Sequence, residues 1–132
     1  MNDFEYLDDC ASKWERLVPK KLTRQQQAVL DVLGAIGLVE GDGVEALWVE
    51  CGSSMDRIIE SFRMAGANEI ADVLQGTSFC REIIARTPPD ADDWAYSGPA
   101  EERKLTDALF LISKKGPDAR EGLLGFLPKR RS

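Results

Sequence analysis

The apolar residues of this chain recur in steps of three and four, which is the spacing of a helical stripe. The first stripe covers residues 3–18 and is carried by Phe4, Leu7, Ala11, Trp14 and Val18. We expect Pro19 to end this helix. Thr23 and Gln26 have capping-box spacing, which predicts the start of a second helix. Gly37 is expected to end that second helix.

Glycines predict the boundaries of the next helices. Residues 41–43, with the sequence Gly-Asp-Gly, are expected to form a turn. A short helix should follow and end at Gly52, because its apolar residues keep helical spacing up to that point. Gly66 is expected to close the helix after it. Gly76 is expected to divide the segment that follows into two pieces.

The last part of the chain begins with a predicted loop. Residues 87–98 contain two prolines and several turn-forming residues. Pro99 suits the first position of a helix, and Gly116 is expected to end that helix. Pro117 should start a last short helix, followed by a frayed basic tail at residues 128–132.

No segment shows the alternation of a strand, so the patterns predict an all-α fold of six to eight short helices. The 132 residues suit one domain spanning residues 1–132. Apolar residues make up 43% of the chain and charged residues 30%. This balance is typical of a globular protein rather than a disordered one.

Composition excludes several kinds of site. The chain has no histidine, which removes histidine-based triads and histidine-ligated metal sites. Three cysteines, at 10, 51 and 80, form no C-x-x-C pair, so we expect free thiols in a reducing compartment. The acidic N-terminal stretch lacks the apolar core of a signal peptide, and no apolar run is long enough to span a membrane. We therefore predict a cytoplasmic protein without cofactor, metal or membrane contact.

The acidic residues are unevenly distributed. The net charge is −6, which argues against direct binding of nucleic acid by the whole surface. Residues 31–73 hold nine acidic residues and two basic ones, whereas the rest of the chain is almost neutral. The carboxylates of Glu40, Asp42, Glu45 and Glu50 are therefore candidates for binding a basic partner. A solvated surface with acidic helix starts would explain the same pattern.

A second candidate binding patch lies in the predicted loop. Asp90, Asp92 and Asp93 precede Trp94, and an acidic cluster beside a tryptophan is a plausible recognition site because tryptophan is enriched at binding hot spots. The spacing does not fit a calcium loop, since the expected glycine and glutamate are missing. The alternative is a loop that Trp94 tethers to the core.

Residues 33–75 include the segment GDGVEALWVECGSS and, after it, IIESFRMAGANEIADVLQ. These segments resemble a family of small bacterial all-helical domains of unknown function that includes a DNA-mimic protein. The family pattern is an N-G-G-F turn opening a short aromatic helix, then I-G-A, then A-x-x-[IL]. The corresponding residues here are Gly41-Asp42-Gly43-Val44, Leu47 and Trp48, Ala65-Gly66-Ala67, and Ala71 with Leu74. The resemblance implies a helical fold and a partner that is a basic, nucleic-acid-binding protein.

Taken together, these patterns favour a non-enzymatic, acidic protein-binding domain, with DNA mimicry as the form that the resemblance implies. We expect a monomer or a homodimer. An immunity protein or antitoxin that neutralises a basic toxin is a close alternative. A third hypothesis is a small enzyme that uses paired carboxylates, although no nucleophile elbow, P-loop or dinucleotide-binding motif is present.

Overall fold

The computed structural model describes residues 2–17, 19–88, 90 and 98–130. Across these residues the chain is helical and forms no strand, which confirms the predicted all-α class. In chain order the elements are α1 (Asp3–Trp14), a 3-10 turn (Pro19–Lys21), α2 (Arg24–Asp42), α3 (Val44–Cys51), a second 3-10 turn (Gly52–Ser54), α4 (Met55–Met64), α5 (Asn68–Gly76), α6 (Cys80–Arg86), α7 (Pro99–Gly122) and a third 3-10 turn (Leu124–Phe126).

The start of α2 matches the predicted capping box. The Thr23 hydroxyl accepts a hydrogen bond from the Gln26 backbone N–H at 3.1 Å, and the Gln26 side chain accepts one from the Thr23 N–H at 3.0 Å. These two bonds satisfy donors that the first helical turn leaves without partners. Helix α1 ends at Trp14, before the expected end at Pro19.

The predicted end of α2 is wrong. The helix continues through Gly37 and Gly41 to Asp42, so residues 41–43 do not form the expected turn. A glycine inside a helix costs only about 1 kcal/mol relative to alanine. Burial of neighbouring apolar residues, Val39 among them, outweighs that cost. Gly43 follows the last residue of the helix, and its positive φ of 95° redirects the chain into α3.

The breaks expected after α3, α4 and α5 are confirmed. Gly52 follows the end of α3, and Gly66 follows the end of α4 with a φ of 80°. Gly76 is the last residue of α5. Glycine tolerates positive φ without the clash that a Cβ would cause, so Gly66 can reverse the chain between α4 and α5.

Helix α7 begins at Pro99 as predicted, but the expected break at Gly116 is wrong. The helix runs 24 residues, through Pro117, to Gly122. Proline in a helix interior removes one backbone hydrogen bond. Packing holds the helix together here, because Gly116 is buried and lies against Ile36 of α2. The two long helices, α2 and α7, replace the short ones that the sequence predicts.

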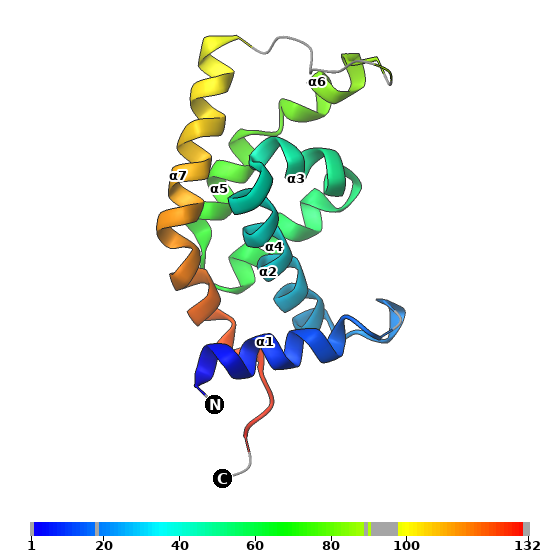
Figure 1. The fold of residues 1–132 in the computed structure, drawn as a ribbon, viewed down its shortest axis with the longest axis vertical. Coiled ribbons are helices and arrows are strands. Elements are labelled where there is room, and N and C mark those ends of the chain that lie inside the picture. Colours follow the sequence, from blue (N-terminus) through cyan, green and yellow to red (C-terminus); the bar gives the residue numbers. More distant parts are fainter. Residues whose placement is uncertain (1, 18, 89, 91–97, 131–132) are drawn as a thin grey trace.

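Helices α2 and α7 form the long axis of the molecule, and α1 lies across their ends (Figure 1). On another side of α2 lie α3 and α4, while α5 packs against α4 and α7, and α6 packs against α3 (Figure 1). The largest fully buried side chains come from all seven of these helices and the residue after α7: Trp48, Phe62, Leu7, Leu47, Met55, Ile70, Leu74, Ile83, Ile112, Leu123, Val29 and Val32. No helix in the described part of the chain combines the length and apolar character needed to cross a membrane.

Candidate functional site

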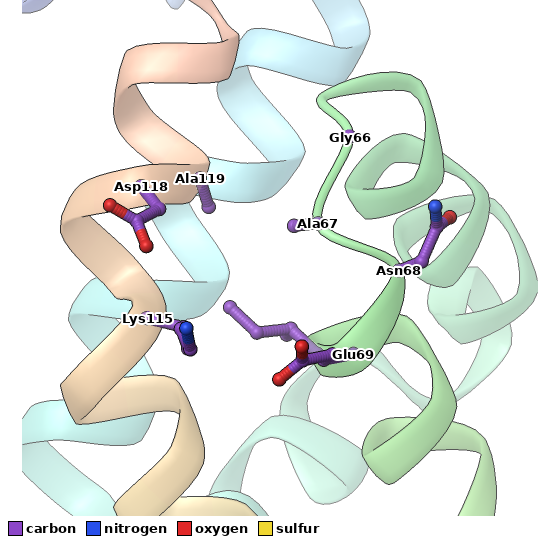
Figure 2. A pocket seen from close by; sticks show the side chains of 8 residues that line it. Gly66, Ala67, Asn68, Glu69, Lys115, Asp118 and Ala119 are labelled. Carbon is purple, nitrogen blue, oxygen red and sulfur yellow. The ribbon is translucent and has the colours of Figure 1, made fainter.

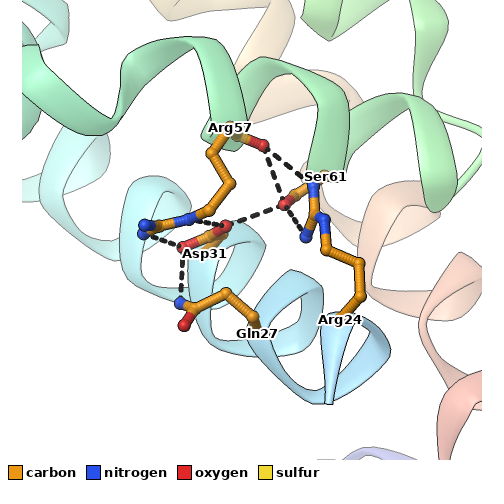
Figure 3. Close-up of polar contacts among 5 residues, drawn as sticks. All are labelled: Arg24, Gln27, Asp31, Arg57 and Ser61. Atoms are coloured by element: carbon orange, nitrogen blue, oxygen red, sulfur yellow. Dashed lines mark hydrogen bonds and ion pairs between the residues drawn. The ribbon is translucent and has the colours of Figure 1, made fainter. Parts of the chain in front are cut away.

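One of the nine acidic residues in the 31–73 segment lies inside the protein. Asp31 is 6% exposed, and its carboxylate accepts two hydrogen bonds from Arg57, at 3.0 and 2.9 Å (Figure 3). Gln27 donates a third bond at 3.0 Å and Ser61 a fourth at 2.8 Å. This bonding raises the pKa of the Arg57 guanidinium. Asp31 therefore joins α2 to α4 and adds little to the acidic surface.

Two more aspartates of the segment are neutralised by arginines. Asp72 of α5 pairs with Arg63 of α4 at 3.0 Å. Asp56 of α4 pairs with Arg81 of α6 at 2.9 Å. The Arg81 guanidinium also lies over the ring of Trp48, 5.1 Å from its centroid. Both basic residues of the segment, Arg57 and Arg63, are thus engaged in ion pairs within the fold.

The remaining acidic residues of the segment carry charge that no ion pair balances within the described part of the chain. They are Glu40, Asp42, Glu45, Glu50, Glu60 and Glu69. Glu45 is half-buried and the others are exposed. The four predicted binding residues of α2 and α3 all belong to this group.

A further feature of the sequence explains why four of these carboxylates stay unbalanced. No lysine or arginine occurs between Arg24 and Arg57. This basic-free stretch, residues 25–56, contains almost all of α2 and all of α3. The charge balance of residues 31–73 does not reveal this basic-free stretch, although the stretch is visible in the sequence. Positive charge must therefore reach this surface from other elements or from a partner.

Helix α3 separates its two glutamates. Residues five apart on a helix point about 140° away from each other. Glu45 faces the side of Cys80 in α6, where its charge adds to the burial that raises the pKa of that thiol. Glu50 faces the other side, where its charge adds to the burial that raises the pKa of Cys51. The two carboxylates thus flank the outer surface of α3 rather than forming one compact cluster.

The buried side of α3 is fixed by polar and apolar contacts. Val44, Leu47 and Trp48 are buried in the core. The Trp48 indole N–H donates a hydrogen bond to the hydroxyl of buried Thr77 at 2.9 Å. This bond satisfies a polar group that burial would otherwise leave unpaired. The core thereby holds α3 in one orientation and determines which of its residues face outward.

Two of the three cysteines, Cys51 and Cys80, lie in surroundings that disfavour the thiolate. Cys10 and Cys80 are buried and Cys51 is half-buried, and all three are free. Burial raises the pKa of Cys80 to about 12, and it raises the pKa of Cys51 as well. A thiol is a poor nucleophile when its pKa is raised. These positions suit packing rather than covalent chemistry.

Two clefts bring carboxylates together with basic groups. The first, of about 290 Å³, lies between the start of α5 and α7, where Glu69 points toward Lys115 (Figure 2). The second, of about 360 Å³, lies between α4 and the end of α5, and includes the Asp56–Arg81 and Arg63 contacts. Each cleft can hold a small polar group. Acid–base chemistry would additionally need a carboxyl or amine whose pKa lies near the working pH, beside the reacting group.

The predicted loop site is described only at its start. Asp90 is exposed. Asp92, Asp93 and Trp94 lie outside the described residues, so that prediction stays a prediction. Among the residues that the structure does describe, no three cysteine, aspartate or glutamate side chains are grouped to hold a metal ion.

Comparison of the chain with protein-family models, with curated proteins and with solved structures finds no match.

Proposed function

We propose that this chain is a protein-binding domain that engages a basic partner through Glu40, Asp42, Glu45 and Glu50, at the end of α2 and on α3. One observation carries the proposal: these carboxylates lie in a stretch without basic residues, and no ion pair balances them within the described structure. The core holds α3, so its acidic residues are presented without a large ordering cost.

The energetics favour recognition by charge complementarity. Exposed carboxylates steer a basic surface during encounter and fix its orientation after contact. Because such charges are screened over about 8–10 Å at physiological salt, binding should weaken as salt concentration rises. A neutral partner would gain nothing from these charges.

In its more specific form, the partner is a basic, nucleic-acid-binding protein and the chain acts as a DNA mimic. Duplex DNA carries one charge per about 1.7 Å of its axis, so four carboxylates correspond to about 7 Å of duplex. One copy of the chain would therefore imitate a short row of phosphates rather than a whole groove. The family resemblance of residues 33–75 favours this form.

The test is capture of partners from a lysate of the source cells at low salt, followed by elution in a salt gradient. One variant carries Glu40→Gln, Asp42→Asn, Glu45→Gln and Glu50→Gln. The matched control removes four exposed carboxylates outside the basic-free stretch, by Glu15→Gln, Glu102→Gln, Asp107→Asn and Glu121→Gln. Both variants have the same net charge, so they separate the position of the charge from its amount.

Loss of a basic nucleic-acid-binding protein with the first variant, and its retention by the control, would support DNA mimicry. A small toxin with the same pattern of loss would favour the immunity alternative. Equal capture by both variants and the unchanged chain would contradict the proposed surface.

A further inference from the structure

The outer face of α3 carries an exposed apolar residue between the two glutamates. Val49 is 51% exposed. The structure describes all of residues 25–56, and Val49 is the one large apolar side chain that is exposed among them. On a helical projection, Glu45 lies about 40° to one side of Val49 and Glu50 about 100° to the other. Ala46, a small residue, points between Val49 and Glu50, and the equally small Ser53 follows in the 3-10 turn Gly52–Ser54.

The surroundings of Val49 leave it uncovered. On many helix surfaces the long stems of lysine and arginine lie over exposed apolar groups. The basic-free stretch offers no such stem on α3 itself or in the chain on either side of it. Arg81 of α6 reaches α3, but its guanidinium lies over the ring of Trp48. The small neighbours add little cover, so the Val49 side chain projects from a face bordered by carboxylates.

Charge decides what can cover this face. A second copy of the chain would bring Glu45 and Glu50 against their own equivalents, and like charges placed opposite each other oppose binding. An anionic lipid surface is disfavoured for the same reason. A protein segment with basic residues on either side of an apolar residue complements both the carboxylates and Val49.

We infer that the outer face of α3 docks a basic amphipathic segment of a partner protein, with Val49 as the apolar contact and Glu45 and Glu50 at its rim. The inference rests on the proposed function and adds the chemistry of the partner. It differs from mimicry by charge alone, because the apolar contact persists at salt concentrations that screen the carboxylates. Apolar contacts surrounded by polar residues are the usual anatomy of a protein interface.

The probes are two synthetic peptides with the same number and spacing of lysines. In one, the positions between the lysines are leucine, which makes an amphipathic helix; in the other they are glutamine. Each is titrated against the full chain at about 0.05 M and 0.5 M salt, and backbone amide shifts locate the contact. We expect the leucine peptide to bind more tightly, and the largest shifts to lie on α3.

The decisive variant is Val49→Ser. Serine and valine have similar helix propensities, so α3 should persist, and circular dichroism with a thermal scan checks this. The expected result is a loss of about three- to tenfold in affinity for the leucine peptide at both salt concentrations, with no change for the glutamine peptide. The control is Phe110→Ser on α7, where the phenylalanine is 69% exposed, and it should leave both affinities unchanged.

The outcomes separate this inference from the function on which it rests. The variant that neutralises Glu40, Asp42, Glu45 and Glu50 tests the acidic surface. If it binds both peptides with the same affinity as the unchanged chain does, the acidic surface itself is refuted. If that variant loses binding while Val49→Ser does not, the carboxylates act alone and the apolar contact is refuted. Largest shifts away from α3 would also overturn the inference.

Discussion

Replacing Asp31 by alanine should destabilise the protein more than removing any exposed carboxylate. The substitution deletes a buried group that accepts four hydrogen bonds from Gln27, Arg57 and Ser61. Removing one partner of a fully buried ion pair costs about 3–5 kcal/mol, because the other charge is left uncompensated. The Arg57 side chain is 45% exposed, so water can solvate it once the carboxylate is gone. We therefore expect a smaller loss of about 2–3 kcal/mol in the free energy of unfolding.

Urea denaturation followed by circular dichroism measures this loss, and a thermal scan should show Tm falling by about 6–12 °C. The matched control is Asp72→Ala, which removes an ion pair whose aspartate side chain is 69% exposed. Exposed pairs of this kind contribute about 0–1 kcal/mol. A double-mutant cycle with Arg57→Ala then isolates the coupling between the two side chains.

An Asp31→Ala variant no less stable than Asp72→Ala would show that the buried carboxylate contributes no more than an exposed one. A coupling energy between Asp31 and Arg57 below about 0.5 kcal/mol would show that apolar packing alone holds α2 and α4 together.

Three further predictions concern stability. Gly122→Ala should cost about 1–3 kcal/mol or more, because the new methyl group would overlap the carbonyl oxygen of Ala65; urea denaturation measures the loss. Thr23→Ala should cost about 1 kcal/mol by removing the hydroxyl that accepts the Gln26 N–H, and the same assay applies. Because burial raises the pKa of the Cys80 thiol from 9.0 to about 12, only the unfolded chain ionises this group readily. The stability that the buried, un-ionised thiol contributes is thus complete below pH 9 and falls as the pH rises from 9 towards 12. The free energy of unfolding, measured by urea denaturation across that pH range, should show this fall.

Matched variants test the three reasons. Gly34→Ala also adds a methyl group inside a helix, but nothing lies near it, so it should stabilise the protein by up to about 1 kcal/mol; equal effects at both glycines would contradict the overlap. Thr23→Ser keeps the hydroxyl, and a loss as large as that of Thr23→Ala would exclude the cap as the cause. The fall in stability above pH 9 should become shallower in Cys80→Ala, and an unchanged slope would assign it to other groups.

Features that depend on near neighbours along the chain could be predicted from the amino-acid sequence. The spacing of apolar residues predicted helices, and the pairing of Thr23 with Gln26 predicted where α2 begins. Pro99 predicted the start of α7, and Gly66 the end of α4. Each of these signals acts within one or two helical turns, so no knowledge of the fold is needed to interpret it.

The tertiary structure decided which local signals prevail. Gly37 does not end α2, and Gly116 with Pro117 does not end α7. A glycine costs a helix about 1 kcal/mol, and a proline about 3 kcal/mol. Burying several apolar side chains between α2, α7 and the rest of the core offsets these costs. Such burial depends on residues distant in the sequence, so the pattern near each glycine could not reveal it.

The same holds for the acidic residues. In the sequence, nothing distinguishes Asp31 and Asp56 from Glu40 and Glu50. In the fold, Asp31 pairs with an arginine 26 residues later and Asp56 with one 25 residues later, each from another helix. The excess of acidic residues in the 31–73 segment could be found from the sequence. The packing of α2, α4 and α6 decided which charges are neutralised and which remain for a partner, because ion pairs form only where helices bring opposite charges within reach.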